Sequence, residues 1–229
     1  DLPGCYSLMA HSAEEEVARD FICFGEPDAV VVVCDATCLE RNLNLVLQTI
    51  EITKKTIVCV NLMDEARKKK IAINIRKLEQ LLGVPVVCTA ARSGTGLEEL
   101  LEKLEEKVKQ PNETSIPVVY EESLEKAIHM VEKQILNICK DKISPRWTAL
   151  KLIEGDVQAI DSVTWYLETD IKTAAGESVE SARALLNENE MNDSNLQDKI
   201  VSSIVKRAEE IAEETVTFEN EKYDEKDRK

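Results

Sequence analysis

The chain has 229 residues, of which 43% are hydrophobic and 32% are charged, and its formal net charge is −15. This is the composition of an ordinary globular protein that is large enough to bury one or two cores. The acidic balance argues against a nucleic-acid-binding protein, which needs a basic face, and no apolar run reaches the roughly 18–20 residues that span a bilayer.

The first half of the sequence predicts alternating strands and helices. Apolar runs that are rich in β-branched residues predict parallel strands buried on both faces, at 28–37, 55–64 and 84–96. Apolar residues at helical spacing predict helices, at 40–53, 74–83 and 97–110, with Gly83 and Pro111 as stop signals. This alternation predicts an α/β fold with a parallel sheet and right-handed crossovers.

The second half predicts only helices. Ser144 and Pro145 form an N-cap and a first helical position, and 177–190 reads as a short helix. Two longer segments carry apolar stripes, formed by Leu124, Ile128, Val131, Ile135 and Ile138 and by Leu196, Ile200, Ile204, Ala208 and Ile211. These stripes predict a small antiparallel bundle of helices.

The cysteines are predicted to be structural. There are seven of them, an odd number, and several lie inside apolar, strand-like runs. Such residues behave as small buried hydrophobic groups in a reducing compartment. With only two histidines in the chain, no spacing typical of a zinc site is present.

Polar residues follow two of the predicted strands, where ligands bind in parallel sheets. Asn61 and Asp64 lie three residues apart after the second strand. The Asn61 amide can meet the O6/N7 edge of guanine, and the Asp64 carboxylate can accept hydrogen bonds from N1–H and the exocyclic amine. Adenine offers no such pair of donors, so the carboxylate would supply specificity. Thr89, Ala90 and Ala91, after the third strand, would bring backbone N–H groups toward the guanine O6.

The chain opens on the turn signal Asp1-Leu2-Pro3-Gly4, which usually follows a strand. At this place Asp1 would hold Mg²⁺ through water, and Gly4 would bring its backbone N–H against a terminal phosphate, where a Cβ would obstruct it. Each motif alone occurs often in ordinary turns. Together and in this order they predict a guanine-nucleotide-binding domain that takes GTP or GDP with Mg²⁺.

The sequence resembles the cytoplasmic region of the ferrous iron transport protein B family, FeoB. "DLPGCYSL", "NLMDEARKKK" and "TAARSGTGLEEL" look like that family's third, fourth and fifth G motifs. "PDAVVVVCDATCLERNLNLVLQ" resembles the stretch that follows the third motif, and "PRWTALKLIEGD" a landmark of the family's helical domain. The match is close over residues 1 to about 110 and looser beyond.

The resemblance implies a GTP-binding and GTP-hydrolysing regulatory part of a prokaryotic Fe²⁺ transporter, at the cytoplasmic face of the membrane. It implies a partial GTPase domain (residues 1–111), a helical regulatory domain (112–218) and a charged linker (219–229) toward a membrane permease. The switch that senses the nucleotide would run from Asp1 to about Asp20. The resemblance is compatible with a homo-oligomer, and it does not decide whether this region binds iron.

Three departures from the usual G motifs bear on this expectation. Leu62 stands where many GTPases have Lys, although an apolar residue is normal in this family, and Ala90-Ala91 replaces Ser-Ala. Cys5 occupies the place where many GTPases have a water-orienting Gln, which implies slow hydrolysis. No G-x-x-x-x-G-K-[ST] occurs in the sequence, so we expect a fragment whose phosphate-binding loop lies upstream and which is inactive alone.

Two alternatives remain from the sequence. One is a soluble GTPase of the ribosome-assembly type, which would need a basic RNA-binding appendage that the acidic helical half does not offer. The other is a non-catalytic interaction module in the present, truncated form.

Overall fold

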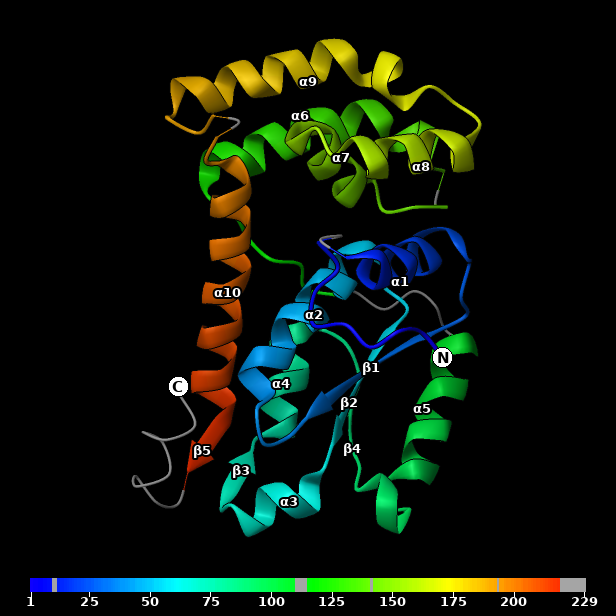
Figure 1. The fold of residues 1–229 in the computed structure, drawn as a ribbon, viewed down its shortest axis with the longest axis vertical. Helices are drawn as coiled ribbons and strands as arrows, with labels where there is room; N and C mark the ends of the chain where they lie inside the picture. The colour runs from blue at the N-terminus through cyan, green and yellow to red at the C-terminus, as the bar shows by residue number, and fades with distance from the viewer. Residues whose placement is uncertain (10–11, 110–114, 141, 193, 219–229) are drawn as a thin grey trace.

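A computed structural model describes residues 1–9, 12–109, 115–140, 142–192 and 194–218. Its centre is a parallel sheet of β1 (Val30–Asp35), β2 (Thr56–Asn61) and β4 (Val86–Cys88), in the order β1-β2-β4. Every β2 residue before Asn61 is buried, as expected for a central strand covered on both faces. The sheet confirms the predicted α/β fold (Figure 1).

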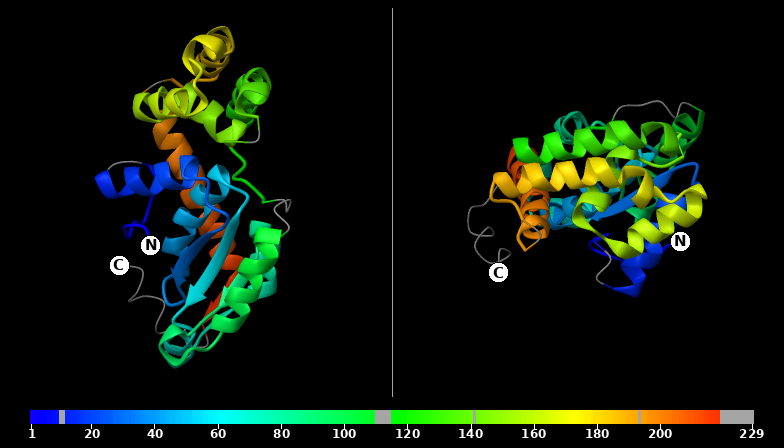
Figure 2. Two further views of the ribbon diagram at one scale, coloured as in Figure 1. Left: turned by 90° about the vertical axis from the view of Figure 1, so that its right-hand side faces the viewer. Right: turned by 90° about the horizontal axis from the view of Figure 1, so that it is seen from above.

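Helices cover both faces of this sheet. The α2 helix (Leu39–Ile52) packs on β1 and β2, and α4 (Ile75–Leu82) packs on β4. The α5 helix (Leu97–Lys109) lies on the face opposite to α2 (Figure 2). Gly83 ends α4 in the left-handed conformation, with φ of 67°, as its predicted role as a stop signal requires.

Two helices of the first half, the helix Val157–Leu167 of the second half and a small second sheet were not predicted. The α1 helix (Ala13–Phe24) follows the opening segment, and the short α3 (Met63–Lys68) follows β2. The strands β3 (Ile71–Ile73) and β5 (Val216–Phe218) pair antiparallel, although the paired residues Ala72 and Thr217 are 145 positions apart in the sequence. Three-residue strands give too short a pattern to be read from the sequence.

The helical half contains α6 (Glu122–Cys139), α7 (Pro145–Glu154), α8 (Val157–Leu167) and α9 (Ile171–Glu188). The α6 helix packs against α7 and α9, and its predicted stripe is buried except for Ile138, which is half-buried. Ser144 caps α7 as predicted, by accepting a hydrogen bond from the Trp147 N–H at 3.2 Å. The helix predicted at 177–190 is longer, because Asp170 caps it seven residues earlier.

The α10 helix (Leu196–Thr215) corrects the predicted bundle. Its stripe is buried as expected, but the helix packs against α2 and α4 of the first half. Figure 1 shows it descending beside these helices and carrying β5 to β3. An apolar stripe shows that one helix face is buried and does not reveal its partner. The predicted boundary at 111/112 and the linker at 219–229 lie outside the described residues. None of the helices in the described ranges combines the length and the apolarity that a membrane span needs.

Candidate nucleotide-binding site

Asn61 connects the ends of the two neighbouring strands β2 and β4. Its side-chain Oδ1 accepts hydrogen bonds from the Thr89 hydroxyl and from the Ala91 N–H, both at 3.0 Å. A backbone N–H can only donate, so the Asn61 atom that faces it must be the amide oxygen. The Asn61 NH₂ group is therefore left for a ligand, and it has no protein partner among the described residues.

The turn that follows β4 is held tightly against the sheet. The Thr89 N–H donates to the Val60 carbonyl at 2.8 Å, and its hydroxyl lies 3.3 Å from the Cys59 sulfur. The Ala90 N–H donates to the Thr95 carbonyl at 3.0 Å. Gly96 closes the turn with φ of +79°, and a Cβ there would lie 2.0 Å from the Cys88 carbonyl oxygen. Only glycine fits this close approach.

The three N–H groups expected to face the guanine O6 all have partners inside the protein. Those of Thr89 and Ala90 hold the turn to β2 and to Thr95, so freeing either would disrupt the turn itself. The Ala91 N–H is bound only to the Asn61 side chain, and Ala91 is exposed. A contact to O6 is thus reduced to Ala91, whose present hydrogen bond would be exchanged or shared.

Asp64 lies in the first turn of α3 and is tied to the same turn. The Met63 N–H donates to the Thr89 carbonyl at 3.2 Å, and Leu62 before it adopts the left-handed conformation with φ of 61°. Asp64 is half-buried, and within the described ranges its carboxylate has no hydrogen-bond or ion-pair partner. A partly desolvated acceptor without a protein donor suits a ligand that brings two donors.

Asp1 and Gly4 are not joined to this site by any contact among the described residues. Both are exposed and lie in an irregular segment, and a Cβ on Gly4 would meet nothing within 4 Å. The segment runs along α2 instead, where Ser7 and the Leu8 N–H bond the Gln48 side chain. A single exposed carboxylate fits Mg²⁺ only if nucleotide phosphate and water supply the remaining ligands.

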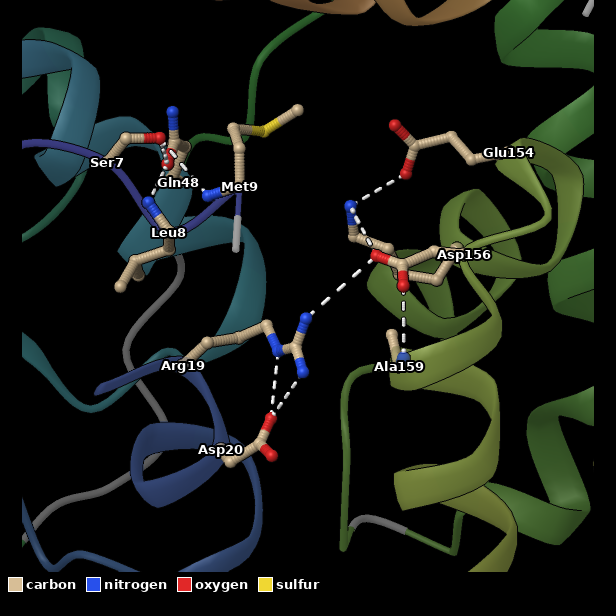
Figure 3. A network of polar contacts seen from close by, with 10 residues as sticks. Ser7, Leu8, Met9, Arg19, Asp20, Gln48, Glu154, Asp156 and Ala159 are labelled. Carbon is tan, nitrogen blue, oxygen red and sulfur yellow. Dashed lines mark hydrogen bonds and ion pairs between the residues drawn. The ribbon is translucent and has the colours of Figure 1, made fainter. Parts of the chain in front are cut away.

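A second polar cluster joins α1 to the helical half (Figure 3). Arg19 on α1 is completely buried, and its Nε donates to Asp20 at 2.8 Å. Its far nitrogen lies 3.9 Å from the Asp156 carboxylate, which caps α8 through the Ala159 N–H. Lys151 of α7 lies 3.6 Å from the same carboxylate and 2.7 Å from Glu154. No motif in the sequence points to this cluster, since its members come from distant segments.

A third cluster lies where the two halves connect. The buried Glu51 of α2 accepts a hydrogen bond from the Tyr120 hydroxyl at 2.8 Å, and Arg146 of α7 lies 3.8 Å from it. Arg146 also holds Glu125 of α6 by two hydrogen bonds of 2.8 and 2.7 Å. Burial raises the pKa of Glu51 to about 7, despite the opposing effects of Tyr120 and Arg146.

A parallel sheet with polar strand ends, joined to a set of helices, defines an α/β domain with a helical appendage. Residues 1–104 match the sequence family described as ferrous iron transport protein B, and residues 120–217 match the FeoB cytosolic helical domain. The chain belongs to the FeoB family.

The relatives and solved structures agree with this assignment. FeoB of Helicobacter pylori is 47% identical over 93 residues, which are 41% of this chain and 14% of that protein. FeoB of Escherichia coli is 36% identical over 161 residues, which are 69% of this chain and 20% of that protein. The chain therefore spans at most about a fifth of these relatives.

Among solved structures, the cytosolic domain of T. maritima FeoB in a GDP form is 31% identical, with a TM-score of 0.70. The likeness covers 95% of this chain and 79% of that one. A GDP-bound mutant of S. thermophilus NFeoB is 28% identical, with a TM-score of 0.78, and the likeness covers 95% and 80% of the two chains.

Proposed function

We propose that this chain is the guanine-nucleotide-binding regulatory part of a Fe²⁺ transporter, at the cytoplasmic face of a membrane, with a permease beyond residue 218. The observation that carries the proposal is the hydrogen-bonded junction of the β2 and β4 ends. There Asn61 fixes the 89–91 turn and leaves its own NH₂ group unpartnered among the described residues, three residues before the unpaired carboxylate of Asp64. The GDP-bound forms of related cytosolic domains support the choice of ligand.

The proposed recognition of guanine divides between three groups. The Asn61 NH₂ donates to N7, the Asp64 carboxylate accepts from N1–H and the exocyclic amine, and the Ala91 N–H reaches O6. Leu62, which is 38% exposed, covers one face of the purine. An adenine would leave the Asp64 carboxylate without donors, and an unpaired partly buried charge is costly.

GTP hydrolysis is proposed for the complete protein, with Asp1 holding Mg²⁺ through water and Gly4 against the terminal phosphate. Bound Mg²⁺ would neutralise charge that develops on the phosphates. Cys5 does not supply a base, because burial and the nearby Glu15 carboxylate raise the pKa of its thiol. Because Cys5 stands where many GTPases have a water-orienting Gln, hydrolysis is expected to be slow.

The route from nucleotide to helices is proposed to pass through α1. This helix begins at Ala13, after the segment that follows the D-x-x-G motif, and meets the helical half through Arg19 and Asp156. The 3.9 Å separation is long for an ion pair, so a small movement of α1 would tighten or break it. Nucleotide state would thereby bias how the helical half sits on the sheet, and through it the permease.

The test is nucleotide binding by the full-length protein, with labelled GDP, GTP and ATP. Asp64→Asn removes the negative charge and replaces one of the two accepting oxygens with an NH₂ group that opposes the guanine amine. Losing one hydrogen bond to a charged acceptor costs about 2 kcal/mol, so affinity for GDP should fall about thirtyfold. Xanthosine diphosphate should regain affinity in this variant, because xanthine carries a carbonyl where guanine carries the amine. Asp161→Asn, on the exposed face of α8, is the matched control.

Equal binding of GDP and ATP by the wild-type protein would contradict the proposal. The polar strand ends would then be ordinary turns, and a non-catalytic interaction module would be the better description. Membership of the FeoB family already disfavours the ribosome-assembly alternative.

A further inference from the structure

Four consecutive basic residues lie at the end of α3 and in the turn that leads to β3. We call Arg67, Lys68, Lys69 and Lys70 the basic turn; all four side chains are exposed. Lys68 pairs with Glu65 at 2.7 Å, whereas the other three form no ion pair within the described ranges. Asp64 and Glu65 precede the turn, so the local charge is reduced but stays positive. The chain as a whole has a net charge of −15, so the positive charge of this segment is opposite in sign to that of the rest of the molecule.

The basic turn lies where the described chain ends. Ile71, directly after it, pairs with Phe218, and Ile73 pairs with Val216. The Asn74 N–H donates to the Thr215 carbonyl at 2.8 Å, which fixes the end of α10 at the same place. Figure 1 shows β3, β5 and α3 together at the end of the molecule opposite to α6, α8 and α9.

We propose that the basic turn is a contact surface for anionic lipid headgroups. The inference rests on the proposed function, which places a permease, and therefore a membrane, beyond residue 218. The β3–β5 pairing then fixes the basic turn beside the point where the chain leaves for the membrane, with Phe218, which is 41% exposed, next to it.

Electrostatics favours this orientation over others. A basic residue close to an anionic leaflet is attracted by about 1 kcal/mol, and the attraction decays within a Debye length of about 8 Å. The anionic leaflet repels the acidic remainder of the chain only where that part comes close to it, because salt screens the repulsion at longer distances. At the same end, Glu213 and Glu214 of α10 oppose this attraction, although Lys77 pairs with Glu214 at 3.0 Å. The basic turn is thus the part of this end that an anionic membrane attracts, and it brings the neighbouring Asp64 loop toward the lipid surface.

The experiment presents the full 229-residue chain on vesicles through a C-terminal hexahistidine tag and a nickel-chelating lipid, in the geometry that the proposal requires. One set of vesicles is phosphatidylcholine, and the other also contains phosphatidylglycerol. Mass spectrometry follows the acylation of individual lysines. We expect acylation of Lys68, Lys69 and Lys70 to slow about fivefold on the anionic vesicles and to recover at high salt. Lys133, Lys140 and Lys172, on the far helices, should be unaffected.

A charge-matched pair of variants tests the same contact by binding. With limiting nickel lipid, the tag and the basic turn act together, so phosphatidylglycerol should raise the bound fraction. Lys69→Gln with Lys70→Gln should remove this gain, and Lys133→Gln with Lys172→Gln should keep it. All four substitutions are at exposed positions, and unchanged thermal midpoints verify folding.

Equal acylation on both kinds of vesicle would overturn the inference, as would equal losses from the two pairs of variants. Protection that persists at high salt would also overturn it, because the contact would then not be electrostatic. The assay contains neither nucleotide nor iron. Intact GDP binding by the full-length protein together with a failed lipid contact would therefore reject this inference alone.

Discussion

At the scale of single residues, the carboxylates Asp64 and Glu51 show how burial and partners decide what a group can do. Asp64 is half-buried and has no partner in the described part of the chain, which leaves it available to a ligand. Glu51 is buried and is held by Tyr120, which gives it a structural task. The same carboxylate chemistry is thus left open to a ligand after one strand and connects the two halves at another place.

Glu51 should make stability depend on pH. Its folded pKa of about 7 lies above the ordinary 4.5, chiefly through burial, so the folded protein binds more protons than the unfolded one between these values. The free energy of unfolding should therefore fall as pH rises from about 4.5 to about 7, by up to a few kcal/mol. Tyr120, Arg146, Lys151 and Glu154 are the charged or titratable groups that act on it.

Glu51→Gln keeps the shape of the side chain and removes its ionisable group. Urea unfolding of both proteins across this pH range measures the effect, and the difference between them should shift in favour of the variant as pH rises. A constant difference would show that Glu51 does not carry the pH dependence.

The residues of the candidate site were predictable to different degrees. Asn61, Asp64 and Thr89 stand where apolar runs stop, and the carboxyl ends of parallel strands meet by topology. That Asn61 would bind the Ala91 N–H could not be foreseen, because it depends on the path of the turn. Arg19 and Asp156 give no sequence signal, since their meeting requires the packing of α1 against the helical half.

At the scale of elements, the turn after β4 depends on Gly96. Gly96→Ala would place its Cβ 2.0 Å from the Cys88 carbonyl and force a residue with a Cβ to adopt φ of +79°. We expect a loss of at least about 2 kcal/mol, seen as a lower midpoint in urea. Gly176→Ala is the control, because nothing lies within 4 Å of its Cβ in α9, and it should stabilise by about 0.5–1 kcal/mol. Equal effects of the two would refute this account.

The contact of α1 with the helical half should contribute little to the stability of the fold, although we propose that it couples nucleotide state to the helices. Arg19 is completely buried, and its NH1 and NH2 groups make no well-aligned hydrogen bond, so desolvation offsets much of the attraction to Asp20 and Asp156. Arg19→Met removes the buried charge and leaves two carboxylates that are partly exposed, Asp20 at 33% and Asp156 at 22%, so neither becomes an uncompensated buried charge. The free energy of unfolding should therefore change by less than about 1 kcal/mol. If nucleotide state reaches the helices through α1, the backbone amides of α8 in the full-length wild-type protein should exchange at different rates with GDP and with a GTP analogue. In Arg19→Met this difference should disappear.

Arg76→Met is the control for this change, since Arg76 is an exposed residue of α4. It should leave the exchange difference intact. If Arg19→Met also left it intact, the proposed route from nucleotide to helices would be wrong.

Elements differ in how much of them the sequence predicts. The β1, β2 and β4 strands and the α6 stripe follow from local patterns, because each strand is a continuous apolar run and the stripe repeats at helical spacing. The β3–β5 pair and the docking of α10 on α2 do not, because both depend on contacts between distant parts of the chain. The long-range placement of α10 is one of the connections between the two halves, beside Arg19–Asp156 and the Glu51–Arg146 cluster.

At the scale of the whole molecule, α10 packs against elements of both the helical half and the sheet half. Ile200 and Ile204 of α10 line a cavity of about 20 Å³ together with Ile52 of α2 and Trp147 and Leu150 of α7. Elements from both halves thus meet around one small space, which is large enough for about one water molecule. Loss of packing here should weaken both halves together.

Ile204→Ala tests this cooperation. Ile204 is 3% exposed, and its truncation should cost about 2–4 kcal/mol through lost burial and an enlarged cavity. Native-state hydrogen exchange should show that the backbone amides of α2 and α7 lose the same amount of protection. The reason is that residues of both helices line the cavity against which Ile204 packs. Val205→Ala, at the 39% exposed neighbouring position of the same helix, should leave both unchanged. A loss of protection confined to α10 would show that the halves are stabilised independently, and the path from nucleotide to permease would then have to run through α1 alone.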